Sequence, residues 1–293
     1  MLSPAARAFV EEATGSPVAS VDPLVGGWTS TMLAIACQDG TDVVLRQMTR
    51  EPWRTHASAL LARESWVQGV LATTSVPAPA SLALDADGLR TGVPSHLMTR
   101  LPGALELRRD DADLVDRLAR LLADVHAVVP PERPRAYQSW AGEQKQVVPT
   151  WAGRPDAWRS AFAVLEDEPP AAPGVFLHRD LHLGNVLWQG GEVSGVVDWV
   201  ETSWGPADLD VAHARTYLAM LHGPDVADAL ARAYDLLRAD GGAHGRRYWD
   251  VMDVVGHLPD PSKVTAPWRD SGVGVPDEIS AARLEEHLVR VLG

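Results

Sequence analysis

The stretch that decides the fold spans residues 176–188 and reads FLHRDLHLGNVLW. It sets two histidines, an aspartate and an asparagine into an otherwise apolar run. Two interpretations compete. His178, Asp180 and His182 could be ligands of a metal hydrolase centre, because imidazole and carboxylate suit zinc or iron. The same letters also spell H-R-D-x-x-x-x-N, which is typical of the catalytic loop of phosphoryl-transfer enzymes.

The metal-hydrolase interpretation relies on strand geometry. Alternate residues of an extended strand point the same way, so the three side chains could converge on one ion. Such a site needs further ligands downstream, but the remaining histidines, such as His213, His222 and His257, are scattered without paired spacing. This interpretation also leaves Asn185 without a role. The residues therefore favour phosphoryl transfer.

In the phosphoryl-transfer interpretation, each polar residue of the stretch has a task. Asp180 accepts or orients the proton of an attacking hydroxyl, and Asn185 turns its amide oxygen to a magnesium ion. A second magnesium carboxylate should follow on an adjacent strand, where Asp198 stands. A hairpin turning at Gly190 and Gly191 would bring Asn185 and Asp198 to one end of the same ribbon. Two hard oxygen ligands, completed by phosphate oxygens and waters, suit Mg²⁺.

The longer segment 178–199, HRDLHLGNVLWQGGEVSGVVDW, resembles the signature of the aminoglycoside phosphotransferase family, whose fold is similar to that of protein kinases. The resemblance covers nearly the whole chain. That family usually has glycine where this chain has Arg179, which is the protein-kinase form. A protein kinase is not expected, because Pro206 comes only eight positions after Asp198 and no long activation segment intervenes. A small-molecule acceptor is favoured.

The pattern of residues predicts an α+β fold with two lobes, and the resemblance implies that this fold is protein-kinase-like, with the nucleotide bound by the first lobe and the acceptor by the second. Residues 1–101 are expected to form the N-terminal nucleotide-binding lobe, a five-stranded antiparallel sheet with one main helix at about 55–73. Residues 102–293 are expected to form a larger, mostly helical, catalytic and substrate-binding lobe. Its helical patterns lie at about 111–128, 156–165, 207–221, 225–238, 247–255 and 277–292.

The first lobe offers candidate phosphate-binding parts. Gly26 and Gly27, between the first two β-prone runs, would let the backbone approach phosphates, and Thr29 and Ser30 could add hydroxyl donors. A Gly-Gly pair is also an ordinary turn. The kinase-like plan next needs a cation on the third strand, where this chain has Arg46.

The expected partner of Arg46 is Glu64, in the helix that follows the third strand. A solvated surface ion pair is the alternative. By the resemblance, the carbonyl of Thr99 and the amide of Leu101 would meet the adenine edge, with Met98 close to the ring. Met98 would equally suit an ordinary core position.

The resemblance also implies supporting roles around the catalytic loop. His178 is expected to pack and hydrogen-bond behind the catalytic aspartate, and His182 is expected to be structural too. Asp210, with Asp208 close behind it, is expected to support the loop. Capping of a helix N-terminus is the alternative for both aspartates.

For the acceptor, the sequence offers two kinds of side chain. The carboxylates of Glu201, Asp250, Asp253 and Asp260 could pair with the ammonium groups of a cationic acceptor. Trp204 could instead offer a flat wall to a macrolide or a sugar ring, as could others of the eleven tryptophans, among them Trp140, Trp151, Trp199, Trp249 and Trp268. Neither set selects a molecule.

The composition of the chain excludes some classes of binding partner. The chain has 293 residues and a formal net charge of −13, which argues against nucleic acid or an anionic membrane as partner. Cys37 is the only cysteine, so neither a disulfide framework nor a cysteine-based zinc site is expected. No stretch approaches the roughly 18 uninterrupted apolar residues of a membrane span, and no leader is recognised at the N-terminus. We expect a cytoplasmic monomer or homodimer.

Together these features predict an ATP- or GTP-dependent, magnesium-dependent O-phosphotransferase. Its acceptor would be a hydroxyl of a small molecule, first of all an antibiotic such as an aminoglycoside. The alternatives are a metabolic kinase for an amino alcohol, homoserine or a sugar, and a kinase for a macrolide or peptide antibiotic. A nucleotide-binding pseudokinase scaffold is a further alternative, which the presence of Asp180, Asn185 and Asp198 disfavours.

Overall fold

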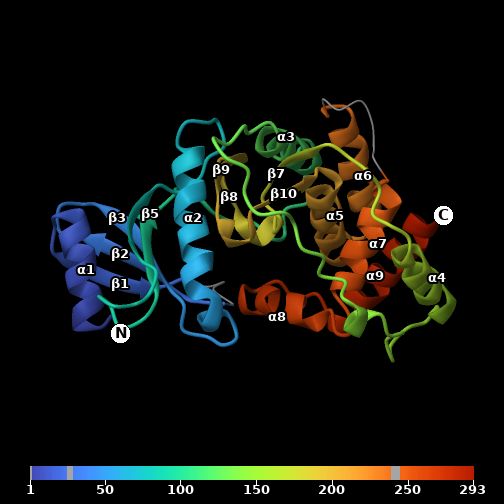
Figure 1. Cartoon of the computed structure of the whole chain (residues 1–293), viewed down its shortest axis with the longest axis horizontal. Coiled ribbons are helices and arrows are strands. Elements are labelled where there is room, and N and C mark those ends of the chain that lie inside the picture. Colours follow the sequence, from blue (N-terminus) through green and yellow to red (C-terminus); the bar gives the residue numbers. More distant parts are fainter. Residues whose placement is uncertain (1, 25–28, 239–244) are drawn as a thin grey trace. The chain divides into compact units, whose positions relative to one another are not determined.

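The structure is a computed structural model, and it describes residues 2–24, 29–238 and 245–293. By its internal contacts the chain divides into two compact units (Figure 1). Unit 1 comprises Met1–Ala104 and Leu187–Glu201, and unit 2 comprises Leu105–Val186 and Thr202–Gly293. The division groups residues 187–201 with the N-terminal lobe, whereas the boundary expected between residues 101 and 102 assigns them to the second lobe.

Unit 1 contains the predicted five-stranded antiparallel sheet, in the order β1-β2-β3-β5-β4. Its strands are β1 (Val18–Pro23), β2 (Thr31–Cys37), β3 (Asp42–Gln47), β4 (Ser81–Asp85) and β5 (Ser95–Thr99). The short 3₁₀ helix η1 (Trp53–His56) precedes the main helix of this unit. The sheet and the mainly helical unit 2 confirm the α+β class expected from the sequence.

Two helices bind opposite faces of this sheet. Helix α1 (Pro4–Thr14) begins at Ser3, whose hydroxyl oxygen accepts a hydrogen bond from the amide of Ala6 at 3.1 Å. It shares one hydrophobic cluster with every second residue of β2 and β3, together with residues of β1 and β5. The intervening residues of β3 and β5 contact α2 (Ala57–Leu71) instead, through polar side chains. The sheet therefore has one apolar face and one face that carries buried charge.

A second, three-stranded sheet has the order β6-β8-β9, with β6 (Ala104–Leu105), β8 (Val186–Gln189) and β9 (Glu192–Val196). Strands β8 and β9 form the predicted hairpin, and Gly190 and Gly191 turn it with φ of 60° and 85°. Positive φ at both central residues is the conformation that a two-residue hairpin turn requires. The 3₁₀ helix η4 (Trp199–Glu201) follows this hairpin.

Unit 2 is built around α5 (Asp208–His222), in which every residue from Asp208 to Leu221 is buried. The helices of this unit are α3 (Leu114–His126), α4 (Pro155–Glu166), α5, α6 (Pro224–Asp235), α7 (Arg246–Gly256), α8 (Ser262–Asp270) and α9 (Asp277–Leu292), with 3₁₀ helices η2 (Glu143–Lys145) and η3 (Leu183–Asn185). Helix α5 packs against α6, α7 and α9. A helix buried on all sides serves as the core of its unit.

One strand and one α-helix of unit 2 were not predicted. Strand β10 (Ser203–Pro206) pairs antiparallel with β7 (Gly174–Leu177), which directly precedes the loop that begins at His178. Helix α8 contains Pro267, a residue that normally interrupts a helical pattern. Both elements are short, and neither has a clear periodicity of its own.

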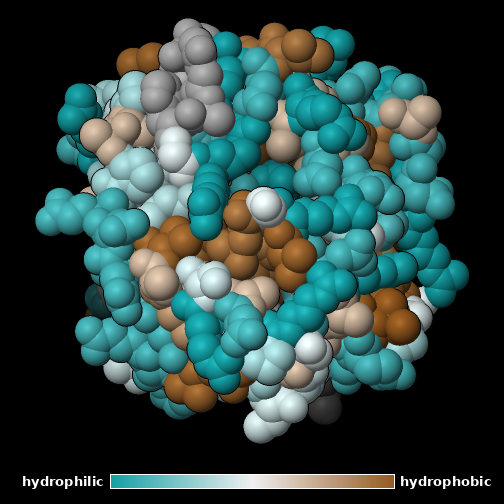
Figure 2. Space-filling view, turned by 90° about the vertical axis from the view of Figure 1, so that its right-hand side faces the viewer, coloured by the Kyte–Doolittle hydropathy of each residue, from teal (hydrophilic) through white to brown (hydrophobic). Residues whose placement is uncertain are grey.

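The surface seen from the right-hand side of Figure 1 is mostly hydrophilic, with hydrophobic side chains gathered near its centre (Figure 2). None of the helices within the described residues is long and apolar enough to cross a lipid bilayer.

Candidate functional site

The loop after β7 is attached to the first turn of α5. The carboxylate oxygens of Asp210 accept hydrogen bonds from the backbone amides of His178 and Arg179, at 2.8 and 2.7 Å. The amide of Asp180 in turn donates to the Nδ1 atom of His178 at 3.2 Å. Burial alone would raise the pKa of Asp210, but the hydrogen bond with His126 and nearby charges outweigh it and hold this pKa below its usual value. An ionised Asp210 therefore fixes the backbone of the loop.

Arg179 occupies a strained position in this loop. Its φ of 75° lies in the left-handed region that favours glycine. Its guanidinium lies over the ring of Trp140 at 4.0 Å and donates to the carbonyl of Gln138 at 3.2 Å. These contacts offset part of the backbone strain, and they tie the loop to the segment between α3 and α4.

The carboxylate of Asp180 is oriented by one donor on each oxygen. His213 Nε2 lies 3.0 Å from Oδ1, and Asn185 Nδ2 donates to Oδ2 at 3.1 Å. The same Asn185 nitrogen also donates to the backbone carbonyl of Asp180 at 2.8 Å. The side chain of Asp180 is 26% exposed. This carboxylate is therefore fixed in direction and still accessible.

His213 also contacts a second carboxylate, because its Nδ1 lies 2.9 Å from Asp253 Oδ1. Burial alone would lower the pKa of His213, but Asp253 and Asp180 outweigh this and raise it to about 9. Burial would likewise raise the pKa of both aspartates, yet the hydrogen bonds and charge of His213 hold the pKa of each well below its usual range. All three groups are charged near neutral pH.

His182, in the loop after β7, is neutral near pH 7. His182 stacks on Tyr217 with ring centroids 4.1 Å apart and an interplanar angle of 11°. Burial lowers the pKa of His182 to about 4, although Asp180 opposes the shift. Its Nδ1 accepts a hydrogen bond from the amide of Gly184 at 3.0 Å. The ring nitrogens of His178 and His182 thus serve the backbone of the loop.

Asp180 lines a cavity of about 390 Å³ that lies within unit 2. Its walls combine aromatic rings, apolar side chains and charges of both signs. The lining residues are Trp140, Gln144, Lys145, Asp180, His213, Tyr217, Gly256, His257, Leu258, Pro259, Asp260 and Val264. The ammonium group of Lys145 donates to the carbonyl of Gly256. Such a mixed lining suits a ligand that carries both polar and apolar groups.

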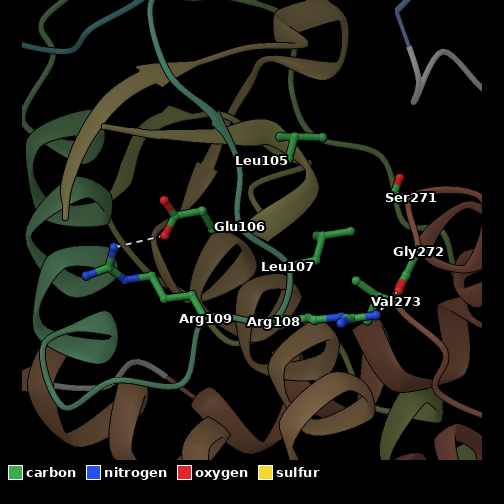
Figure 3. A pocket seen from close by; sticks show the side chains of 8 residues that line it. All are labelled: Leu105, Glu106, Leu107, Arg108, Arg109, Ser271, Gly272 and Val273. Atoms are coloured by element: carbon green, nitrogen blue, oxygen red, sulfur yellow. Dashed lines mark hydrogen bonds and ion pairs between the residues drawn. The ribbon is translucent and has the colours of Figure 1, made fainter. Parts of the chain in front are cut away.

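A larger and more open pocket of unit 2, about 570 Å³, lies beside β6 and the loop between α8 and α9 (Figure 3). Arg108 reaches across it and donates to the carbonyl of Gly272, while Arg109 pairs with Glu106 at 3.2 Å. Both guanidinium groups therefore have protein partners. Among the residues predicted for the site, none lines this pocket.

Unit 1 contains a buried polar cluster centred on Arg46 of β3. Its guanidinium lies 3.3 Å from Glu64 Oε1 and 2.9 Å from Asp198 Oδ1. The other Glu64 oxygen lies 2.9 Å from Nδ1 of His96. Burial would raise the pKa of Glu64, but the charge of Arg46 and the contact with His96 outweigh it and lower this pKa. The pair is buried, so it is not the solvated surface pair considered as the alternative.

The other nucleotide-site candidates lie in unit 1. Gly26 and Gly27 fall outside the described residues. The Ser30 hydroxyl is buried and donates to the sulfur of Met32 at 3.4 Å, whereas Thr29 is half-buried.

The hinge candidates lie at the end of β5. Met98 is buried against α2, where the amide of Gln68 approaches its sulfur at 3.5 Å. The Thr99 hydroxyl accepts from the amide of Ala80 at 2.9 Å. Leu101 packs on Gly195, and a Cβ atom at that glycine would meet it at 2.6 Å.

The acceptor candidates lie in several places. Asp250 is buried in an ion pair with Arg215, and burial raises its pKa to about 6 although Arg215 opposes the shift. Trp204 lies on β10, where its amide donates to the carbonyl of residue 135 at 2.7 Å. Glu201 ends η4 in unit 1. Asp253 approaches Asp180 through His213, and Trp140 and Asp260 line the same cavity as Asp180.

Sequence reasoning missed His213 as a site residue. Its spacing to Asp210 contained the signal, because residues three apart in a helix share one face. Asp210 reaches the loop backbone and His213 reaches the Asp180 carboxylate from that face of α5. Of the residues that line the cavity from 256 to 264, the sequence had singled out Asp260, as a carboxylate for a cationic acceptor.

The metal candidates are oxygen donors. The Asn185 amide nitrogen is directed to Asp180, which leaves the amide oxygen for a ligand outside the loop. The carboxylate of Asp198 already accepts one hydrogen bond from Arg46, and its φ is 67°. No group of three or more His, Cys, Asp or Glu side chains in the described part of the chain is arranged to hold a metal ion. Amide and carboxylate oxygens are of the ligand type that Mg²⁺ prefers.

Comparison with known proteins gives the family. A family model described as the phosphotransferase enzyme family matches residues 20–249. A homoserine kinase of Chelativorans sp. (strain BNC1) is 34% identical over 145 residues, which cover 44% of this chain and 44% of that protein. The match thus spans less than half of the relative's length.

Solved structures share the fold over nearly the whole chain. One is a thermostable mutant of the aminoglycoside phosphotransferase APH(4)-Ia in ternary complex with ADP and hygromycin B, with 16% identity, 98% of this chain and 97% of that chain covered, and a TM-score of 0.64. Another is the macrolide 2′-phosphotransferase MphH of Brachybacterium faecium, with 15% identity, 94% and 96% coverage, and a TM-score of 0.59. At these sequence identities the likeness shows a shared fold and nothing about substrate or mechanism.

Proposed function

We propose, from the fact that this chain belongs to the phosphotransferase enzyme family, that it transfers the γ-phosphoryl group of a nucleoside triphosphate to a hydroxyl of a small molecule. One observation carries the proposal: the ionised carboxylate of Asp180 is held by two donors and lines a cavity. A hydroxyl bound there would be oriented for attack on the phosphorus. The new oxygen–phosphorus bond forms as the bond to the leaving nucleoside diphosphate breaks, and the hydroxyl proton passes to the Asp180 carboxylate.

The polar cluster of unit 1 would bind the phosphates of the nucleotide. Arg46, held by Glu64, would bind phosphate oxygens, because a buried guanidinium in a fixed ion pair is a preorganised cation. Asn185 directly precedes β8, and Asp198 follows β9 by two positions along the chain. Each would offer an oxygen ligand to Mg²⁺, which neutralises phosphate charge when bound. ATP is the expected donor, since a relative with this fold was crystallised with ADP.

Two classes of acceptor fit the family: an antibiotic such as an aminoglycoside, and a small amino alcohol, including the hydroxy amino acid homoserine. The carboxylates of Asp250 and Asp253 are buried in ion pairs with Arg215 and His213, so they offer no negative charge to a polycation. The cavity lining contains charges of both signs, which suits a zwitterion such as homoserine better than a simple amino alcohol, which is only a cation. We therefore favour an amino alcohol that also carries a carboxylate, in line with the partial match to a homoserine kinase.

Nucleoside-diphosphate release over a panel of acceptors tests this function. The panel contains homoserine, choline-type amino alcohols, hygromycin-type aminoglycosides and macrolides, each with ATP or GTP and Mg²⁺. We expect turnover with homoserine rather than with a choline-type amino alcohol, and a fall in kcat of roughly 10²–10⁴-fold in Asp180→Asn, since a positioned acid–base group contributes about that much. Asp225→Asn, an exposed aspartate of α6, is the matched control and should retain full activity.

The outcomes separate the alternatives. Turnover of an aminoglycoside or a macrolide alone would reject the amino alcohol and support the antibiotic. Magnesium-dependent ATP binding without turnover of any acceptor would indicate a scaffold. Unchanged turnover in Asp180→Asn would reject the mechanism.

A further inference from the structure

A chain of three buried or half-buried groups leads away from the cavity. Asp180 contacts Nε2 of His213 at 3.0 Å, and Asp253 contacts Nδ1 of the same ring at 2.9 Å. His213 and Asp253 are each about 2% exposed at their side chains. The two residues belong to α5 and α7, which pack against each other. This imidazole therefore bridges two carboxylates away from bulk water.

The geometry determines the protonation of the bridge. A neutral imidazole has one N–H group and one nitrogen lone pair. With carboxylate oxygens at hydrogen-bonding distance from both nitrogens, a lone pair on either one would face a negative oxygen. The pKa of each aspartate is held well below its usual range, so neither carboxyl group carries a proton to donate. Both nitrogens of His213 therefore donate, and the ring is an imidazolium between Asp180 and Asp253. Charge-assisted hydrogen bonds of this kind are about twice as strong as neutral ones.

We propose that His213 and Asp253 form a positioning pair that fixes the Asp180 carboxylate for phosphoryl transfer. The proposal rests on the function given above, in which Asp180 orients the acceptor hydroxyl. The terminal torsion of an aspartate is broad, so a lone carboxylate rotates easily. With Oδ1 held by His213 and Oδ2 held by Asn185, the remaining lone pairs keep one direction. Asp253 keeps the His213 ring protonated and fixes its orientation.

The alternative is that the pair only joins α5 to α7. Truncating it would then lower stability without any specific effect on the catalytic step. A positioning role instead lowers kcat and leaves the KM values for nucleotide and acceptor nearly unchanged, because binding does not depend on the direction of the Asp180 carboxylate. Imidazole supplied in solution should also restore the missing donor, since His213 borders the cavity.

The first experiment uses three variants of the full chain. In His213→Ala we expect kcat to fall about 100-fold, the scale of a misplaced reacting group, with KM values changed less than threefold. Imidazole should restore at least a tenth of the lost rate. His213→Gln, whose amide can still donate to Asp180, should lose about tenfold, and Asp253→Asn should fall between the two. His56→Ala, an exposed histidine of η1, should keep full activity and show no response to imidazole.

The second experiment needs no acceptor. Nitrogen-15 NMR of histidine-labelled protein at pH 7.5 should find both ring nitrogens of His213 protonated, with the assignment made from the loss of that signal in His213→Gln. In Asp253→Asn the His213 ring should become neutral. A neutral His213 ring in the wild-type protein would overturn the proposal even if no acceptor were known.

The results distinguish this proposal from the proposed function. If Asp180→Asn is inactive while His213→Ala is as active as the wild type, only the positioning pair is wrong. If His213→Ala raises KM without lowering kcat, or is not rescued by imidazole, the pair has a binding or structural role and the proposal fails. If Asp180→Asn is fully active, the proposed function itself fails.

Discussion

Two non-glycine residues of the described chain have positive φ, and both belong to the motif segment: Arg179 and Asp198. Left-handed backbone at a residue with a Cβ costs about 1–2 kcal/mol. Such strain persists only where surrounding contacts enforce it, and it often marks a functional position. At Arg179 the contacts are the two Asp210 hydrogen bonds to the loop and the guanidinium that lies over Trp140.

Replacement of Arg179 separates backbone strain from side-chain contacts. Arg179→Gly and Arg179→Ala both lose the guanidinium, but only glycine adopts a φ of 75° without strain. We expect Arg179→Gly to be more stable than Arg179→Ala by about 1 kcal/mol in urea unfolding. At Arg159, an exposed position inside α4, the order should reverse, because alanine is the better helix former by about 1 kcal/mol. Equal stabilities at residue 179 would contradict the role of strain.

Among the elements, α5 performs two tasks from one face. Asp210, in its first turn, holds the backbone of the loop that follows β7, and His213, one turn later, holds the Asp180 carboxylate of that loop. The full burial of α5 explains how both side chains act away from water. The position of the loop is therefore fixed by its hydrogen bonds to α5, a helix that is buried on all sides.

Asp210→Asn tests the attachment of the loop to α5. One carboxylate oxygen becomes an NH₂ group that faces the amide of His178 or Arg179, so a buried donor loses its acceptor. We expect a loss of about 1–3 kcal/mol in the free energy of unfolding, together with a lower kcat. Chemical denaturation and initial rates measure the two effects. Asp225→Asn of α6, an exposed aspartate, should change neither quantity, and an unaltered Asp210→Asn would show that the loop is held by other contacts.

At the scale of the whole molecule, the buried histidines make stability depend on pH. The pKa of His213 is raised to about 9, so the folded protein holds this proton more tightly than the unfolded chain. Its contribution to stability is complete below about pH 6.5, the pKa of an unperturbed histidine. It is lost as pH rises through 9. Burial lowers the pKa of His182 to about 4 and that of His287 to about 3. These two rings are neutral in the folded protein, so their contribution to stability is lost as pH falls below about 6.5.

Between pH 7 and 9 the free energy of unfolding should therefore fall as pH rises, by up to about 1.4 kcal/mol per pH unit. Chemical denaturation at pH 7, 8 and 9 measures the slope. In His213→Gln the slope should largely vanish, whereas His56→Gln, which removes an exposed histidine, should retain it. Parallel curves for the wild type and His213→Gln would mean that the ring is not held as an imidazolium.

The fold was predictable from local patterns wherever periodicity and turn residues agreed. The five-stranded sheet, the β8–β9 hairpin at Gly190 and Gly191, and the helices around α5 follow such patterns. Helix α8 was missed because Pro267 masks its periodicity, and β10 was missed because a strand of four residues depends on its partner β7. Short elements of this kind are stabilised by tertiary contacts.

The sequence by itself determined which polar residues could do chemistry, since Asp180, Asn185 and Asp198 lie close together along the chain and their spacing survives any packing. Only the tertiary structure decided how those groups are charged and oriented. Asp253 lies forty residues from His213 and meets it through the packing of α7 on α5. Asp250, three residues earlier, meets Arg215 instead. Burial and partner choice set the pKa of a carboxylate, and both arise from contacts between segments that are distant in the chain.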